Sequence, residues 1–408
     1  MKNFLLLAAA FLTSACVLLD RPVSPGRSRN ETIGDPTHKS KNEPEESTDT
    51  SLHLYLSAVE YPKDYDWIKD TAHSTVDARL MLFRDGECIV SFPAGDAYHS
   101  STDPDTHWIL GGHLYTCFSD GHATYIQADG QPLHQFNGAE DIKGMILKDG
   151  VLWTLGQKRR GDGFVLRCNG EAVIDNAQGS LIGSLYEDEG EICFAYGYSI
   201  QNSGFTIRKY YLSASGRDKE VSIPAAATAV FDIRRVGGIT WATYRQPDVS
   251  VYPVLSSDRQ SQLIAREISG AQSVEWCEII PVQEAVWIKA WYTMKDMLRR
   301  FVLWRGKGAV VMFTPYIVIH DFYVDEDGQA GAVGHDSRND NTVLFLPPDG
   351  RSRQDLGRRY RLISPRCGMM IGGKLYAALS GVGEDVLCIN ESRKTISMNG
   401  PLTSIAYQ

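Results

Sequence analysis

The sequence repeats a pattern of short apolar strands and tight turns at intervals of roughly 45 residues. One recurring unit is a glycine turn followed by a strand with an aromatic residue, as at residues 112–115 (GHLY) and 150–153 (GVLW). A second unit turns at Asp-Gly or Asn-Gly between apolar strands, as at residues 129–130 and 169–170, and such dipeptides are strong hairpin signals. The last apolar residues of successive repeats lie 38 to 49 residues apart: Phe92, Phe136, Ile174, Ile223, Ile264, Phe313, Leu356 and Met398.

Each repeat predicts four antiparallel strands, which we name A to D in chain order. A tight turn joins A to B and another joins C to D, whereas the loop from B to C varies in length. The composition, with 37 glycines and 19 tyrosines but 9 methionines, suits short strands and many turns better than helices. Four-stranded modules in such repetition are typical of a β-propeller. We therefore predict an all-β chain of eight four-stranded blades, with seven as the alternative if one irregular region has been divided in two.

The two ends of the repeat region complement each other. The first repeat begins at strand B, near Leu52, and no strand A precedes it. The chain ends with a lone strand at residues 400–407 (GPLTSIAY), which matches the internal strand A at residues 179–186 (GSLIGSLY). A C-terminal strand that completes the first blade would remove the open sheet edge. We therefore predict one propeller domain over residues 52–408, with its first blade closed by the C-terminal strand.

Residues 1–16 have the features of an export signal. Lys2 provides a positive charge, residues 4–12 are apolar but too short to span a bilayer, and small residues follow. Residues 12–16 (LTSAC) resemble a bacterial lipobox, whose cysteine is acylated and becomes the new N-terminus; Thr13 departs from the leucine that is usual at its position. The resemblance implies that Cys16 is lipidated. The alternative is ordinary cleavage after Ala15, with Cys16 incidental.

The residues after Cys16 bear on location in the cell envelope. Val17 stands where an inner-membrane retention signal would place Asp, which by similarity to enterobacterial sorting favours the outer membrane. Residues 17–51 are mainly polar, with many Pro, Ser, Thr, Asn, Glu and Lys, and such a segment cannot bury enough apolar surface to fold. We interpret it as a flexible spacer between a lipid anchor and the domain. In general plan the chain resembles propeller-domain lipoproteins of Gram-negative bacteria.

Charge and cysteine spacing exclude several kinds of partner. The net charge of −9 argues against nucleic acid and against anionic membrane surfaces. Seven cysteines remain after Cys16, and an odd number cannot pair completely. None has the close spacing of a zinc site, and each lies in an apolar, strand-like context. We predict that they are small buried hydrophobes and that the protein has no metal ion or other cofactor.

The longer B–C loops and D–A connections share one face of such a fold, and this face is where we expect a binding site. Loops on a rigid scaffold commonly carry function, and aromatic rings beside forked donors suit a glycan, a peptide or a protein partner. The alternative for single residues is that they are solvated or pack between blades. The candidate residues on this face are Trp67, Arg159, Tyr198, Tyr244, Arg245, Trp291, Tyr292, His335 and Arg338.

No catalytic motif accompanies these residues. The Gly-x-Ser-x-Gly nucleophile elbow is absent from the sequence, and so is the Asp-box repeat of sialidase-type propellers. We therefore predict a non-catalytic binding or scaffold module. The alternative is a glycan-cleaving enzyme that uses paired carboxylates on the same face, for which Asp248, Asp336 and Asp340 are candidates.

The lipobox predicts membrane association through Cys16. Replacing Cys16 by Ser removes the acylated thiol, so the protein should move from the membrane fraction to the soluble envelope fraction when cells are fractionated. An unchanged membrane fraction would contradict lipidation at this residue.

Overall fold

The computed structural model describes most of the chain beyond residue 51. The predicted export signal, Cys16 and the spacer therefore lie outside the described residues. The described ranges are residues 52–67, 69, 77–94, 106–159, 163–202, 205–246, 253–264, 270–283, 285–295, 299–305, 308–312, 317–336, 342–346, 354–357, 360–381, 385–389 and 392–408.

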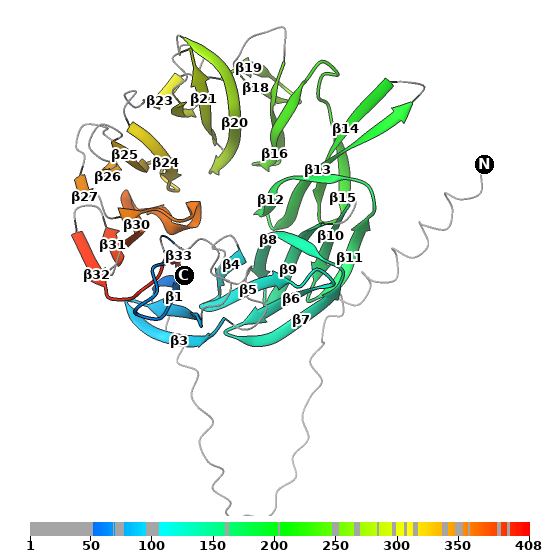
Figure 1. Ribbon diagram of the computed structural model, residues 1–408. Helices are drawn as coiled ribbons and strands as arrows, with labels where there is room; N and C mark the ends of the chain where they lie inside the picture. The colour runs from blue at the N-terminus through cyan, green and yellow to red at the C-terminus, as the bar shows by residue number, and fades with distance from the viewer. Residues whose placement is uncertain are drawn as a thin grey trace, which may run out of the picture. The chain divides into compact units, whose positions relative to one another are not determined.

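The strands of the described residues form eight antiparallel sheets arranged in a ring (Figure 1). The β-propeller predicted from the repeats is thus confirmed, with eight blades rather than seven. In each blade strand A lies nearest the centre of the ring and strand D lies outermost, as β16 and β19 show in Figure 1. No helix in this part of the chain is long and apolar enough to cross a membrane.

The first four blades follow the predicted strand order. Blade 1 contains β33 (Leu402–Tyr407), β1 (Leu54–Glu60), β2 (Arg79–Arg84) and β3 (Glu87–Pro93). Blade 2 contains β4 (His107–Leu110), β5 (His113–Ser119), β6 (Ala123–Ala128) and β7 (Gln131–Asn137). Blade 3 contains β8 (Glu140–Lys148), β9 (Val151–Lys158), β10 (Phe164–Cys168) and β11 (Glu171–Asn176). Blade 4 contains β12 (Ser180–Asp188), β13 (Glu191–Asn202), β14 (Phe205–Ala214) and β15 (Arg217–Val221).

The other four blades repeat this order, and the last has a divided strand A. Blade 5 contains β16 (Ala229–Val236), β17 (Ile239–Arg245), β18 (Val254–Ser257) and β19 (Ser261–Leu263). Blade 6 contains β20 (Ala271–Val282), β21 (Ala285–Met294), β22 (Arg299–Arg305) and β23 (Gly308–Met312). Blade 7 contains β24 (Ile317–Val324), β25 (Ala330–Asp336), β26 (Thr342–Leu346) and β27 (Gln354–Gly357). Blade 8 contains β28 (Tyr360–Arg361), the 3-10 turn η2 (Pro365–Cys367), β29 (Gly368–Ile371), β30 (Lys374–Gly381), β31 (Asp385–Ile389) and β32 (Ser392–Ile396).

The turn dipeptides adopt the left-handed backbone that their residue types favour. Asp129 and Gly130 have φ values of 49° and 78°, and Asn169 and Gly170 have 46° and 86°. Positive φ at both central positions matches the twist of the flanking strands, which is why Asp-Gly and Asn-Gly predict hairpins. In addition, the carboxylate of Asp129 accepts a hydrogen bond from the backbone N–H of Leu114, which ties the C–D turn to strand B.

The C-terminal strand closes the ring as predicted. β33 pairs antiparallel with β1, so the last strand of the chain is the innermost strand of blade 1. In the buried part of this pairing, the hydroxyl of Ser57 bonds the hydroxyls of Thr403 and Ser404 at 2.8 and 2.6 Å. The last residue then reaches blade 2, because the amide of Gln408 bonds the carbonyl of Ile109 and the backbone N–H of Gly112.

The hydrophobic core lies between neighbouring blades. One cluster joins Leu155 and Phe164 of blade 3 to Phe194 and Tyr196 of blade 4, with the two phenylalanine rings edge to face at 5.4 Å. Buried polar contacts reinforce this packing. The carboxylate of Asp232, in blade 5, accepts a hydrogen bond from the backbone N–H of Ile279, in blade 6. Each blade is therefore held by its two neighbours, and the ring depends on all of them.

The cysteines fit the prediction of small apolar residues only in part. All seven in the described region are free thiols. Five of them are buried, whereas Cys168 is half-buried and Cys88 is exposed.

The closure predicts a large stability loss on removal of the last strand. Deleting residues 401–408 removes the buried side chains of Leu402 and Ile405 and leaves β1 with a free edge, so we expect a loss of at least about 5 kcal/mol in urea unfolding. Deletion of the predicted spacer, residues 17–51, is the control and should leave the unfolding free energy unchanged. Equal stability of the two truncated proteins would contradict this closure.

Candidate ligand-binding site on the B–C loop face

Three of the predicted binding residues are core residues. Tyr292 is fully buried and its hydroxyl donates a hydrogen bond to the carbonyl of Ile264. Tyr244 is 4% exposed and packs between blades 4 and 5. Trp67 is 8% exposed and belongs to the hydrophobic cluster between blades 1 and 2. None of them presents its ring on the surface as predicted, because the last aromatics of these strands and loops pack into the space between blades.

Two of the predicted arginines form hydrogen bonds or ion pairs with other residues of the propeller. Arg159 pairs with the carboxylate of Asp141 at 2.6 Å. Arg245 donates to the hydroxyl of Thr228 and to the carbonyl of Val274. Two of the remaining predicted residues, Tyr198 and Trp291, line two separate pockets. Arg338, Asp248 and Asp340 lie outside the described residues.

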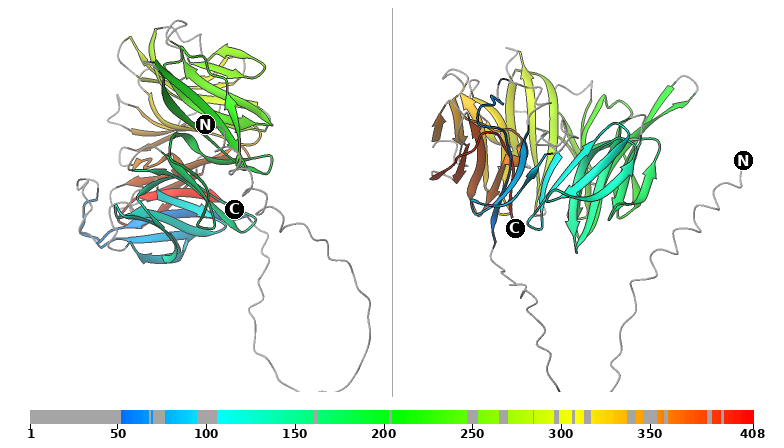
Figure 2. Two further views of the ribbon diagram at one scale, coloured as in Figure 1. Left: turned by 90° about the vertical axis from the view of Figure 1, so that its right-hand side faces the viewer. Right: turned by 60° about the horizontal axis from the view of Figure 1, so that its bottom comes forward.

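A long hairpin in blade 4 sets the geometry of the first pocket. β13 and β14 pair over ten residues, from Cys193 with Ala214 to Asn202 with Phe205. The pairing of β13 with β12 ends at Gly197, and the pairing of β14 with β15 ends at Tyr210. Beyond these points β13 and β14 form a two-stranded ribbon, which extends past the neighbouring strands (Figures 1 and 2).

A cavity lies where this ribbon leaves the blade, next to a glycine of strand B. Ser180, Gly197 and Tyr210 lie opposite one another across β12, β13 and β14. Because Gly197 has no side chain, the ring of Tyr210 lies across it, and a Cβ at Gly197 would be 2.7 Å from Cδ1 of that ring. The resulting Arg208 pocket has a volume of about 530 Å³ and is lined by Gln178, Gly179, Ser180, Ile182, Gly197, Tyr198, Ser199, Arg208, Tyr210 and Val230.

The rim of the Arg208 pocket is braced by the end of β9. The amide nitrogen of Gln157 donates to the carbonyl of Gly163 at 2.7 Å and to that of Gly179 at 3.3 Å. Its amide oxygen accepts a hydrogen bond from the backbone N–H of Leu181 at 2.8 Å. One side chain therefore holds both ends of residues 179–181, which carry the pocket wall opposite the ribbon.

The ribbon itself is stiffened by stacked tyrosines. The ring of Tyr211 stacks on Tyr196 at 5.3 Å and on Tyr198 at 5.5 Å, and the hydroxyls of Tyr198 and Tyr211 are 3.1 Å apart. Hydrogen bonding to Tyr198 raises the pKa of Tyr211 to about 12, so the Tyr211 phenol is neutral at physiological pH. The predicted residue Tyr198 thus fixes the strand from which Ser199 faces the pocket.

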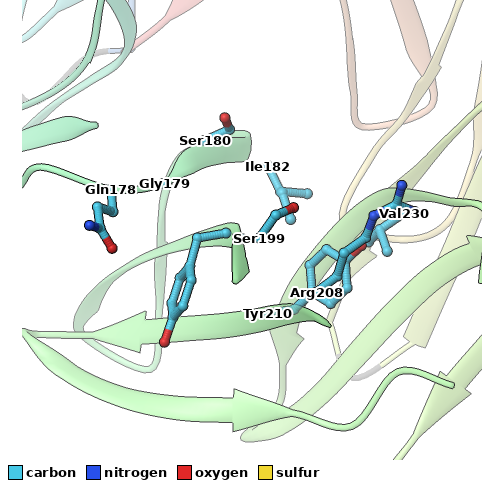
Figure 3. Close-up of a pocket in the computed structure, with 10 residues that line it drawn as sticks. Gln178, Gly179, Ser180, Ile182, Ser199, Arg208, Tyr210 and Val230 are labelled. Carbon is cyan, nitrogen blue, oxygen red and sulfur yellow. The ribbon is translucent and has the colours of Figure 1, made fainter. Parts of the chain in front are cut away.

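Arg208 gives the pocket its charge. It is the only charged residue among the described residues that line this pocket, and its side chain is exposed. Among the described residues it has no hydrogen-bond or ion-pair partner. Figure 3 shows Arg208 and Tyr210 next to each other, across the pocket from Gln178. Forked donors beside an aromatic ring, hydroxyls and an amide can bind one carboxylate together with a polar, ring-shaped group.

A second pocket lies between blades 6 and 7. This tryptophan pocket has a volume of about 280 Å³ and is lined by Trp276, Glu278, Lys289, Ala290, Trp291, Phe301, His320, Asp321, Phe322 and Pro365. It contains the predicted residue Trp291, and His335, also predicted, bonds its lining residue His320. Within the part of the chain that is described, no three His, Cys, Asp or Glu side chains are grouped as a metal site.

Sequence reasoning missed the residues that carry the charge and ring of the Arg208 pocket. It searched the loops, whereas Arg208 and Tyr210 lie within strand C of blade 4. Their spacing of two residues places both side chains on one side of the strand, which is the signal that could have found them. Trp276 was missed because it lies within strand A of blade 6, outside the loops from which the candidates were taken.

Comparison with other proteins shows the fold. No protein-family model and no curated protein matches the sequence. Apo AztD from Citrobacter koseri, a β-propeller protein, is 11% identical with a TM-score of 0.51, over 88% of this chain and 98% of that one. Dihydro-heme d1 dehydrogenase NirN in complex with DHE is 10% identical with a TM-score of 0.52, over 86% and 74%. At these identities the likeness concerns the fold alone.

The contact between Gly197 and Tyr210 predicts a specific coupling. Gly197→Ala should lower the free energy of unfolding by about 1–3 kcal/mol, because the new methyl group overlaps the Tyr210 ring. In a Tyr210→Val background the same change should cost less than half as much, since the ring is gone. Urea denaturation of the four proteins measures the coupling, and an equal cost in both backgrounds would show that the ring does not rest on Gly197.

Proposed function

We propose that this propeller is a non-catalytic binding module that holds a carboxylate-bearing polar ligand, a glycan or a peptide, in the Arg208 pocket. The observation that carries the proposal is the exposed guanidinium of Arg208, which has no partner among the described residues and lies beside the Tyr210 ring. A single cation suits one carboxylate, whose two oxygens match two N–H groups of the guanidinium. The Ser180 and Ser199 hydroxyls and the Gln178 amide are available for the rest of a polar ligand.

We further propose that the domain acts at the cell envelope, exported and held by a lipid on Cys16. The support is the export-signal pattern of residues 1–16, the lipobox resemblance and the polar composition of residues 17–51. With Val17 after the cysteine, the outer membrane is the favoured location. A tether of this kind would leave the binding face free to reach envelope polymers or partner proteins.

For the glycan-cleaving alternative, the described residues of the tryptophan pocket include two carboxylates close to each other. Glu278 and Asp321 both contact the ammonium group of Lys289, at 3.2 and 2.8 Å. Burial raises the pKa of Asp321, as a general acid would need, although Lys289 opposes the shift. However, Asp321 is 8% exposed and the oxygen that contacts Lys289 also accepts a hydrogen bond from the backbone N–H of Phe322. Since this carboxylate is committed to structural contacts, the binding function is favoured.

Binding of the purified domain to carboxylated probes tests the function. The probes are uronic-acid oligosaccharides and peptides with free or amidated C-termini, together with sulfated and phosphorylated glycans as alternative anions. Arg208→Gln should weaken binding of a carboxylated probe roughly 10- to 100-fold, because charge-assisted hydrogen bonds are lost. The matched control is Arg84→Gln, which removes an exposed arginine beside a C–D turn on the opposite face.

The outcomes separate the alternatives. Unchanged binding in the Arg208→Gln protein would contradict the proposed site. Preference for sulfated or phosphorylated glycans would contradict the carboxylate assignment. Release of shorter products from any bound glycan would contradict a non-catalytic function.

A further inference from the structure

The tryptophan pocket has an aromatic wall that comes from three strands of one blade. Trp276 of β20 lies directly opposite Trp291 of β21, which lies directly opposite Phe301 of β22. The ring centroids of Trp276 and Trp291 are 5.8 Å apart, and those of Trp291 and Phe301 are 5.4 Å apart. All three side chains are half-buried, so the wall keeps part of its ring surface accessible.

A β-bulge produces this alignment. The register between β20 and β21 shifts between Val274 and Trp276, so that Glu275 is the extra residue of strand A. Without the shift, Trp276 would not lie opposite Trp291, because a one-residue slip turns side chains to the other side of the sheet. The bulge therefore places both indoles on the side of blade 6 that faces blade 7.

Charged residues line the pocket next to the aromatic wall, and their charges are paired with one another. Lys289 lies opposite Glu278 and bridges it to Asp321, on β24 of the next blade. Burial disfavours the charge of Lys289, but the two carboxylates outweigh it and raise the pKa of the ammonium group. Arg234 contacts Glu278 from the other side, at 3.6 Å. A further ion would have to displace one of these partners, so the pocket suits a neutral ligand.

Hydrogen-bonding capacity nevertheless remains at the pocket surface. The carboxylate of Glu278 is 30% exposed and can accept further hydrogen bonds. His320 and His335 bond each other at 3.1 Å through one ring nitrogen each. Burial lowers the pKa of both rings, and for His320 the neighbouring His335 adds to the effect, so the pair is uncharged at neutral pH.

We propose that the tryptophan pocket is a second ligand site and that it takes a neutral sugar ring. A pyranose has one face of C–H groups, which packs against indole and phenyl faces, and hydroxyls around its edge, which donate to carboxylate and imidazole acceptors. A volume of about 280 Å³ accommodates one such ring. This site is independent of the Arg208 pocket, which lies between blades 4 and 5 and presents a cation that has no partner among the described residues.

Other ligand classes fit the pocket less well. A carboxylate would approach Glu278 and Asp321, and no unpaired cation lines the described part of the pocket. A cationic group over Trp276 would compete with Lys289, which already lies 5.4 Å from the centre of that ring.

Calorimetric titration of the full domain with neutral oligosaccharides tests the proposal. The probes are cello-, xylo-, malto- and chito-oligosaccharides. At least one should bind to the wild-type protein, and Trp276→Ala and Trp291→Ala should each weaken that binding at least about tenfold. Trp276→Phe keeps an aromatic face and should retain most of the affinity. The matched control is Trp153→Ala, which removes a half-buried tryptophan of blade 3 and should leave sugar binding unchanged.

Folding and the first pocket are checked in the same experiment. Each variant is examined by circular dichroism, and Phe301→Ala replaces any tryptophan variant that does not fold. Arg208→Gln should bind neutral sugar as the wild type does, so failure of the carboxylate site and failure of this site are distinguishable. The proposal would be overturned if no neutral probe bound to the wild-type protein. It would also be overturned if binding survived in the double variant Trp276→Ala, Phe301→Ala. Shortened products that disappear in Glu278→Gln would overturn it in favour of catalysis.

Discussion

The pairing of β33 with β1 is the constraint on which the rest of the ring depends. Every hydrophobic cluster formed by the described residues lies between two blades, so a blade needs both neighbours to bury its faces. The ends of the chain meet in blade 1, where Ser57 bonds Thr403 and Ser404 in a buried contact. Closure by a strand, rather than by side-chain contact alone, pairs the inner edge of β1 and gives the loops a rigid frame.

Both pockets arise where a blade departs from its regular repeat. In blade 4, strands B and C continue past strands A and D, and Gly197 lets the Tyr210 ring fold over the sheet. In blade 6, the extra residue Glu275 turns Trp276 toward blade 7. The regular blades supply stability, and these two local irregularities supply surfaces with distinct chemistry. One surface has an arginine with no ion-pair partner in the described part of the chain, and the other has aromatic rings next to a group of paired charges.

The sequence predicted the fold far better than the site, and there is a physical reason for this difference. Residue type largely determines the local backbone conformation of a tight turn, as at Asp129-Gly130 and Asn169-Gly170. Because such turns repeat along the chain, they predicted the blades reliably. A binding site depends instead on which side of a strand each residue occupies and on what lies above it. Tyr244 and Tyr292 therefore looked like loop aromatics but are core residues, and the space above Gly197 was not visible without the pairing register.

The propeller is proposed to bind a carboxylated ligand at Arg208, on its B–C loop face. A crystal structure of the domain with a uronic-acid oligosaccharide tests this most directly. We expect a carboxylate within hydrogen-bonding distance of the Arg208 guanidinium and a sugar ring against Tyr210, with Gln178 or Ser199 bonded to its hydroxyls. An oligosaccharide bound on the face of the A–B and C–D turns, with the Arg208 pocket empty, would contradict it.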